Sequence, residues 1–272
     1  MLNKTHFLLL IEEIYRRSGI LIDEKKFSAL APKVEGIMRR HGFDAFHRFY
    51  EHLQIDKRKD AWQDILNLVT INETYFYREY YQMQTMVSHV LPKLHAHRMG
   101  HEPLRILSAP CSSGEESYSI ALSLLDEKDM LEQRDFEIIG IDINSEAILR
   151  AKEGVFSQRS VKNVPSRLLQ QYFKKNTENF EIAPFLKKAV SFKTLNVMDK
   201  SSMNALGKFD VIFSRNMLIY FDDHSRKQVT TTFHEMLKPK GTLFLGHAET
   251  MHKSTSLFRA EKNANVIYYV KE

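Results

Sequence analysis

Two adjacent glutamates in the middle of the chain stand where a short apolar run turns into a helix. Leu104–Ser108 is typical of a buried strand, and the small residues at 109–114 lead from it to Glu115 and Glu116. A dinucleotide-binding loop needs more glycine than the single Gly114, and paired acids at a helix N-terminus repel a phosphate. The pair therefore favours a cationic ligand, such as one with an amino group and a sulfonium. The alternative is that both acids simply stabilise the first helical turn.

Polar residues also follow two later apolar runs. Asp142 ends the second predicted strand, where doubly wound folds place an acid that binds the hydroxyls of a ribose. It could instead cap the next helix, although Asn144 is better placed for that. Arg215 and Asn216 follow the strand predicted at 209–214, at the edge where open sheets bind ligands. A loop-capping role is the alternative for these two residues.

The elements that must position these residues alternate along the chain from about residue 104. This alternation predicts right-handed βαβ crossovers and an α/β fold with a doubly wound, mainly parallel sheet. The final β-rich run follows a loop, so we expect it to pair antiparallel at the C-terminal edge. Residues 154–189 break the alternation and are expected to insert a small β-subdomain with a short hairpin. Strands are expected at 104–108, 136–142, 190–195, 209–214, 242–246 and 265–270, with helices at 116–125, 145–153 and 225–237.

The first seventy residues have helical periodicity. Apolar residues recur at three- and four-residue spacing in 6–17 and 25–40, and two further helices are expected before residue 70. The pattern predicts an all-helical domain at 1–70 and a second domain at 71–272, which begins with a linker at 71–103. One face of the second helix is basic, through Lys26, Lys33, Arg39 and Arg40.

Composition limits the class of protein and its partners. A net charge of +5 suits an acidic partner, either nucleic acid or a protein surface, although the mixed acids and bases also fit an ordinary solvated surface. The apolar run 7–11 is too short for a signal peptide or a membrane span. A single cysteine, Cys111, excludes an internal disulfide and suits the reducing cytoplasm. His95, His97 and His101 lack an acid or thiol that would complete a ligand set, so we expect no metal.

Five stretches resemble those of the CheR family, the chemotaxis receptor glutamate methyltransferases, in their order and spacing. They are 72–78 (NETYFYR), 108–120 (SAPCSSGEESYSI), 140–143 (GIDI), 209–221 (FDVIFSRNMLIYF) and 241–249 (GTLFLGHAE). The first and the end of the fourth are specific to this family, and the similarity extends over nearly the whole chain. The resemblance implies a class I methyltransferase with a Rossmann-like fold that uses S-adenosylmethionine.

The resemblance also implies roles for individual residues. Glu116 is expected to bind the amino group of the cofactor's methionine part, and Asp142 its ribose, while Asn196 and Val197 flank the adenine. The full set of expected cofactor-binding residues is Asn72, Thr74, Arg78, Gly114, Glu116, Asp142, Asn196, Val197, Arg215 and Asn216.

The implied reaction is methyl transfer to a glutamate side-chain carboxylate, with Arg78 and Tyr220 as the expected catalytic residues near the methyl group. A carboxylate with a reference pKa of about 4.3 is already deprotonated at neutral pH, so no general base is needed. Charge is neutralised as carboxylate and sulfonium react, so a tight arginine pair would stabilise the substrate more than the transition state. We therefore expect both residues to orient the carboxylate in a dry pocket, a contribution of up to roughly 7–11 kcal/mol.

The substrate implied by the resemblance is the acid-rich cytoplasmic helical bundle of a chemoreceptor. The basic face of the second helix is a candidate docking surface, because complementary charge speeds encounter; a solvated helix face is the alternative. In some family members the β-subdomain binds a receptor's C-terminal pentapeptide by strand addition. The turn around 174–181 is short and lacks the glycines of those members, so we expect a pentapeptide-independent enzyme. Nothing in the sequence requires more than a monomer.

Two other functions compete with this one. A nucleic-acid methyltransferase usually has a tetrapeptide such as N/D-P-P-Y/F after the fourth strand, whereas this chain has Arg215-Asn216-Met217-Leu218. A receptor-bound adaptor without turnover would not need the cofactor-matching positions, and here all of them are filled. We therefore expect neither nucleic acid as a partner nor insertion into a membrane, and an enzyme of the cytoplasm.

Overall fold

One seven-stranded sheet carries most of the predicted site residues at the ends of its strands. The computed structural model describes residues 2–56, 59–96, 102–127, 135–251 and 257–272. The strand order is β6-β2-β1-β7-β8-β10-β9. The strands are β1 Leu104–Ser108, β2 Phe136–Asp142, β6 Val190–Thr194, β7 Phe209–Ser214, β8 Leu237–Leu245, β9 Phe258–Asn263 and β10 Val266–Lys271.

In the spatial order of this sheet, the five strands from β6 to β8 run parallel. The sheet is completed by β10 and β9, which join it through antiparallel pairing. β1 pairs in parallel with β2 and β7, β2 with β6, and β7 with β8, while β10 pairs antiparallel with both β8 and β9. The predicted doubly wound α/β fold is therefore confirmed. The predicted edge position of the final strand is wrong, because β9 lies outside it. The sequence of β9, FRAEKN, has the charges of a solvated edge strand and lacks the apolar run of an inner one.

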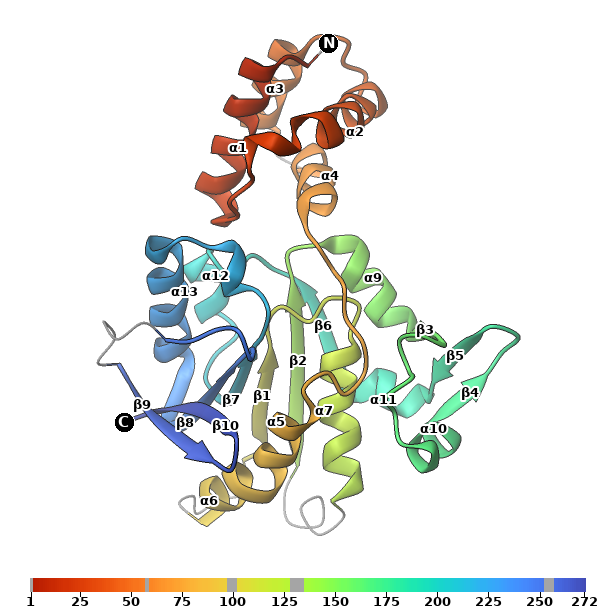
Figure 1. Cartoon of the computed structure of the whole chain (residues 1–272), viewed down its shortest axis with the longest axis vertical. Helices are drawn as coiled ribbons and strands as arrows, with labels where there is room; N and C mark the ends of the chain where they lie inside the picture. The colour runs from red at the N-terminus through yellow and green to blue at the C-terminus, as the bar shows by residue number, and fades with distance from the viewer. Residues whose placement is uncertain (1, 57–58, 97–101, 128–134, 252–256) are drawn as a thin grey trace.

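Helices cover both faces of the sheet (Figure 1). Neighbouring residues of β1 enter different cores, since Ile106 packs with α5, α7 and α9, whereas Leu107 packs with α12 and α13. Successive side chains of a strand point to opposite faces, so both faces of this strand are buried. The helices are α5 Tyr80–Thr85, η2 Met86–Val90, α6 Leu91–Ala96, α7 Glu115–Asp126, α9 Ser145–Glu153, α12 Lys200–Asn204 and α13 Asp223–Met236.

Residues 80–96 are helical, although the sequence analysis predicts a linker throughout 71–103. Met83, Met86 and Leu91 are fully buried in the core on one face of the sheet. Their spacing is helical, so the signal for these helices is present in the sequence.

The N-terminal helices pack around a core of their own, as predicted. Phe7, Phe49 and Ile65 are among its buried members, and Trp62 Nε1 donates to the main-chain oxygen of Leu53 at 2.6 Å. This helical domain stands beyond one end of the sheet (Figure 1), and residues 70–79 run from it across the sheet to α5. Its helices are α1 Lys4–Ser18, η1 Glu24–Lys26, α2 Phe27–Arg40, α3 Phe46–Ile55 and α4 Asp60–Val69.

The predicted β-subdomain forms a separate three-stranded sheet beside α7 and α9. Its strand order is β3-β5-β4, all antiparallel, and β4 and β5 make the expected hairpin with the connection 176–178. Its elements are β3 Val155–Ser157, α10 Ser166–Tyr172, β4 Phe173–Lys175, β5 Asn179–Ile182 and α11 Pro184–Ala189. In the described part of the chain, no helix has both the length and the apolar character needed to cross a bilayer.

Candidate active site

Two adjoining cavities follow the carboxyl ends of the parallel strands. The larger encloses about 800 Å³ of empty space and the smaller about 470 Å³, both including their open mouths. Ile71, Pro110, Ser112 and Asn216 line both, so the two form one continuous cleft. We name the larger the apolar cavity, after its aliphatic and aromatic lining, and the smaller the charged cavity. The charged side chains of the smaller cavity are Glu73, Arg78, Glu116 and Arg215.

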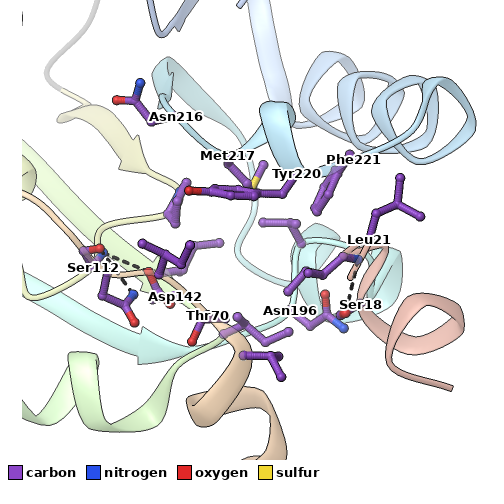
Figure 2. A pocket seen from close by; sticks show the side chains of 18 of the residues that line it. Ser18, Leu21, Thr70, Ser112, Asp142, Asn196, Asn216, Met217, Tyr220 and Phe221 are labelled. Carbon is purple, nitrogen blue, oxygen red and sulfur yellow. Dashed lines mark hydrogen bonds between the residues drawn. The ribbon is translucent and has the colours of Figure 1, made fainter. Parts of the chain in front are cut away.

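The apolar cavity lies between the sheet and the N-terminal helices. Ile141 near the end of β2 and Val197 in the loop after β6 line it, and the ring of Tyr220 lies across it (Figure 2). Ser18 and residues 20–22, at and after the end of α1, line it from the helical domain. A flat, uncharged, partly apolar group such as a nucleobase suits this lining.

Hydrogen bonds fix the helical domain to the apolar cavity. Asn196 Nδ2 donates to the main-chain oxygen of Arg17 at 2.7 Å, and the N–H of Leu21 donates to the main-chain oxygen of Tyr220 at 3.1 Å. The predicted adenine neighbour Asn196 therefore uses its side chain to hold α1, a role that the sequence analysis missed. The helical domain completes the cavity, whereas the sequence predicts a site within the second domain alone.

Asp142 lines the apolar cavity beside Ser112, which lines both cavities, and each oxygen of its carboxylate accepts one main-chain N–H and keeps a lone pair for a further donor. Oδ2 accepts the N–H of Ser112 at 2.9 Å, and Oδ1 accepts the N–H of Asn144 at 2.8 Å. Burial raises the pKa of Asp142, and these N–H donors oppose the rise. Asn144, not Asp142, caps α9, because its side chain accepts the N–H of Ala147 at 2.8 Å. The nearby Asn72 amide oxygen accepts Asn144 Nδ2 at 2.8 Å, which places the predicted linker residue beside the predicted ribose acid.

A buried ion-pair network forms the back of the charged cavity. Glu116 Oε1 accepts the hydroxyl of Ser108 at 2.8 Å, and Oε2 accepts Arg215 Nη1 at 2.9 Å. Arg215 Nη2 donates to the main-chain oxygen of Arg78 at 2.6 Å and lies 3.4 Å from Glu79 Oε2. Burial raises the pKa of Glu116, while the guanidinium of Arg215 opposes that rise. Two carboxylates for one guanidinium leave this network negative, which suits a cationic group. Glu79 is a member that the sequence analysis missed.

The two expected catalytic residues line different cavities. Arg78 lines the charged cavity, where Nη1 donates to the main-chain oxygen of Glu73 at 3.3 Å and Cζ lies 5.8 Å from the ring centroid of Tyr75. Tyr220 lines the apolar cavity, with its hydroxyl pointing toward the side that carries Asp142 (Figure 2). A ligand that spans the continuous cleft would meet both residues.

Two further predicted residues differ in their placement. Thr74 lines the charged cavity, as expected of a ligand contact. Gly114 lines neither cavity. Its φ of +96° starts α7, and a Cβ on it would lie 3.0 Å from the Cβ of Ala151. Gly114 therefore shapes the turn after β1, and its contact with the cofactor stays a prediction.

Comparison with known proteins decides the family. The model for the SAM-binding domain of CheR methyltransferases matches residues 72–267, and the model for their all-alpha domain matches residues 5–70. The chain belongs to the CheR methyltransferase family. This CheR-family protein is therefore an S-adenosylmethionine-dependent methyltransferase, as the sequence predicts.

Relatives match this CheR-family chain over almost all of its length. It is 36% identical to chemotaxis protein methyltransferase 2 of Vibrio cholerae serotype O1, over 100% of this chain and 94% of the relative. It is 32% identical to the chemotaxis protein methyltransferase of Salmonella typhimurium, over 91% of this chain and 84% of that protein. Among solved structures, the magnesium protoporphyrin IX methyltransferase of Synechocystis PCC 6803 is 13% identical over 82% of this chain and 94% of its own, with a TM-score of 0.37.

The cleft of this CheR-family protein fits both ends of S-adenosylmethionine. The apolar cavity has a mainly aliphatic and aromatic lining that suits an adenine, and it includes the carboxylate of Asp142, which is bonded to Ser112 of both cavities. The buried Glu116 carboxylate lines the charged cavity, where it suits the cationic amino group. The donor chemistry of the cleft therefore agrees with the family's cofactor.

Cys111 lines the charged cavity, but its thiol is not placed as a nucleophile. Burial raises the pKa of the Cys111 thiol well above its ordinary value, which keeps it a neutral and poor nucleophile. Within the described ranges, no group of three or more His, Cys, Asp and Glu side chains is placed to hold a metal ion. His95 belongs to α6, and His97 and His101 lie outside the described residues.

Glu115 points away from the cleft and ties the β-subdomain to it. Its Oε1 accepts the hydroxyl of Ser160 and its Oε2 accepts that of Ser113, both at 2.8 Å. Burial raises the pKa of Glu115, and the two hydroxyl donors oppose the rise. The two adjacent acids thus have separate surroundings, since Glu116 faces a cavity and Glu115 a packed interface.

Proposed function

We propose that this protein transfers the methyl group of S-adenosylmethionine to glutamate side-chain carboxylates in the cytoplasmic helical bundle of chemoreceptors. The observation that carries the proposal is the continuous cleft, in which a mainly apolar cavity adjoins one lined by Glu116 and Arg78. The relatives named chemotaxis protein methyltransferase support a receptor as the substrate. The products are glutamate methyl esters and S-adenosylhomocysteine.

The cofactor's groups are assigned along the cleft from one cavity to the other. Val197 and the main chain of Asn196 flank the adenine, Asp142 binds the ribose hydroxyls and Glu116 binds the amino group. The remaining lining residues supported by their position in the cleft are Asn72, Thr74, Arg78, Arg215 and Asn216.

The reaction asks the protein to position groups and to exclude water. When bound, S-adenosylmethionine supplies an electrophilic methyl group, whose bond to sulfur breaks as its bond to the glutamate oxygen forms. The substrate carboxylate is already deprotonated, because its reference pKa is about 4.3, so no residue here needs to accept a proton. Arg78 and Tyr220 orient the carboxylate from the two cavities that meet near Asn216.

The basic face of α2 is the proposed docking surface for the acidic receptor bundle. Arg39 lies 4.0 Å from Glu35 and Arg40 lies 3.0 Å from Asp64, so two of its charges are partly used within the chain. Lys26 is the last residue of η1, immediately before α2, and it lines the apolar cavity, so the basic residues extend from α2 to the cleft. The four side chains are all exposed, and they are Lys26, Lys33, Arg39 and Arg40.

The receptor's C-terminal pentapeptide is not required in this proposal. The connection between β4 and β5 has only the residues 176–178 and includes no glycine. Such a short hairpin gives little length for an added peptide strand. The proposed enzyme acts as a monomer in the cytoplasm, where the receptor bundle lies.

Methyl transfer from tritiated S-adenosylmethionine to purified receptor cytoplasmic fragments tests the proposal. A glutamate methyl ester is expected to give label that is released by mild base. Base-stable label, or label in nucleic acid, would overturn the proposed substrate. Calorimetry with S-adenosylhomocysteine distinguishes the enzyme from a receptor-bound adaptor without turnover, because such an adaptor is expected to bind no cofactor.

A further inference from the structure

A buried carboxylate after β8 holds the turn that follows β7. Glu249 is 7% exposed and lines neither cavity. Its Oε2 accepts the N–H groups of Asn216 and Gly246, both at 2.8 Å, and its Oε1 accepts the N–H of Leu218 at 2.7 Å. One side chain thus joins the loops at the ends of two neighbouring parallel strands.

Only a carboxylate can satisfy this arrangement. Three main-chain donors converge on two oxygens, and an amide offers one oxygen acceptor and brings N–H groups of its own. Buried N–H groups without an acceptor are costly, so replacing the carboxylate by an amide is expected to disturb all three contacts. Position 246 also has to be glycine, because a Cβ there would lie 2.7 Å from Glu249 Oε2 and 2.9 Å from the nitrogen of Asn216.

The turn that Glu249 holds carries residues of both cavities. Asn216 has a φ of +57°, in the left-handed region that few residues other than glycine adopt, and it lines both cavities. The next residues lead to Tyr220, whose N–H donates to the main-chain oxygen of Met217 at 3.1 Å. Arg215 immediately precedes the turn and pairs with Glu116.

We propose that Glu249 is a positioning residue for methyl transfer. It fixes the backbone of Asn216 and Leu218 and so holds Arg215 and Tyr220 at set places on the two sides of the reacting methyl group. This inference rests on the proposed function, because it takes the methyl group to be transferred where the cavities meet. A shift of about 1 Å in such a group can cost about a hundredfold in rate.

Asp210 provides a matched control, because it lies in β7, the strand that leads to the turn held by Glu249, at the end far from the cleft. It is also fully buried, and its Oδ2 accepts the N–H of Arg105 at 2.8 Å and lies 3.0 Å from Lys238 Nζ. It lines neither cavity. D210N therefore also removes a buried, hydrogen-bonded carboxylate, but its contacts lie within the sheet and not in the turn after β7.

The test compares E249Q, E249D and D210N in the full chain. Melting temperature, calorimetric Kd for S-adenosylhomocysteine, and kcat for methylation of a receptor fragment are measured well below the lowest melting temperature. E249Q is expected to lower kcat about tenfold or more, with Kd changed less than about threefold and a melting temperature lowered as in D210N, which keeps its kcat. E249D keeps the charge on a shorter side chain and is expected to lose part of kcat.

The inference is overturned if E249Q and D210N lose kcat equally at equal loss of melting temperature. Should E249Q not fold, E249D against D210N decides in the same way. A wild-type protein that does not methylate the receptor fragment marks failure of the proposed function. Wild-type activity with an unaffected E249Q marks failure of the positioning role alone.

Discussion

The two cavities of the cleft are built in opposite ways. The apolar cavity combines aliphatic and aromatic side chains from the loops after β2, β6 and β7 with residues 18–22 of the helical domain. The charged cavity uses the connecting segment 71–78, the loop after β1 and Arg215 at the end of β7, with a buried ion-pair network behind it. Apolar walls give affinity that depends little on orientation, whereas fixed charges and hydrogen bonds define direction. In the proposed function, the apolar cavity therefore gives affinity for the adenosine part of the cofactor, while the charged cavity binds the amino group and orients the reacting groups.

The largest effect is expected at the mouth of the charged cavity. R78A is expected to lower kcat about a hundredfold, or about 2.7 kcal/mol, with little change in Kd for S-adenosylhomocysteine or in KM for the receptor. R159A is the matched control, because Arg159 is exposed, pairs with Glu73 and lines neither cavity. Steady-state kinetics measure both. The orienting role of Arg78 is contradicted if R78A changes only KM, or if R159A lowers kcat as much as R78A does.

The back of the charged cavity is expected to bind the amino group alone. E116Q is expected to weaken S-adenosylhomocysteine about thirtyfold, because a hydrogen bond to a charged group is worth about 1.5–3 kcal/mol. 5′-Methylthioadenosine lacks the amino-acid group, so its Kd is expected to stay within about twofold. E73Q is the control, since Glu73 lines the same cavity but faces solvent. If calorimetry finds that E116Q raises the Kd of both ligands equally, Glu116 stabilises the conformation of the loop and does not bind the amino group.

The junction of the two cavities is expected to serve the adenosine part of the ligand. D142N is expected to weaken S-adenosylhomocysteine and 5′-methylthioadenosine by the same factor, about tenfold, because both contain the ribose. Binding calorimetry on the same pair of ligands measures this. If D142N spares methylthioadenosine while weakening S-adenosylhomocysteine, Asp142 belongs with the charged cavity and the division made here is wrong.

The smallest effect is expected in the pH dependence of the melting temperature, in which Glu115 contributes to stability and not to ligand binding. Burial raises the folded-state pKa of Glu115, so its protonated form stabilises the fold below the unfolded pKa of about 4.3, and this contribution is lost as pH rises through the folded pKa. E115Q cannot ionise, so its melting temperature relative to wild type is expected to rise by a few degrees between pH 4.5 and 8.

E137Q is the control for this measurement, because the pKa of Glu137 is shifted in the opposite direction from that of Glu115. The guanidinium of Arg105 lowers the pKa of Glu137, so that contribution is fully present above about pH 4.3 and is lost only as pH falls. The difference in melting temperature between E137Q and wild type is therefore expected to stay constant between pH 5 and 8. An E115Q difference that is equally flat would show that Glu115 titrates as an ordinary surface acid.

Much of the fold follows from local patterns in the sequence. The strands β1, β2 and β7 are mainly apolar after a charged second residue, and buried parallel strands typically have such apolar runs. The polar residues directly after them had to meet at one edge, because parallel strands end on the same side of a sheet. The charged strand β9 was missed for the converse reason, since an edge strand half in water has no apolar run.

The sequence by itself determined the sheet, the edge that carries the site and the family to which the chain belongs. Only the tertiary structure decided that Ser18 and residues 20–22 complete the apolar cavity, that the side chain of Asn196 holds α1, and that Glu249 holds the turn after β7. Asn196 and Arg17 are separated by 179 positions, and Glu249 and Asn216 by 33. Periodicity reports which face of an element is buried, but not which distant backbone group a polar side chain will meet. That choice is made when domains and loops pack, because buried donors and acceptors must then find partners wherever the fold places them.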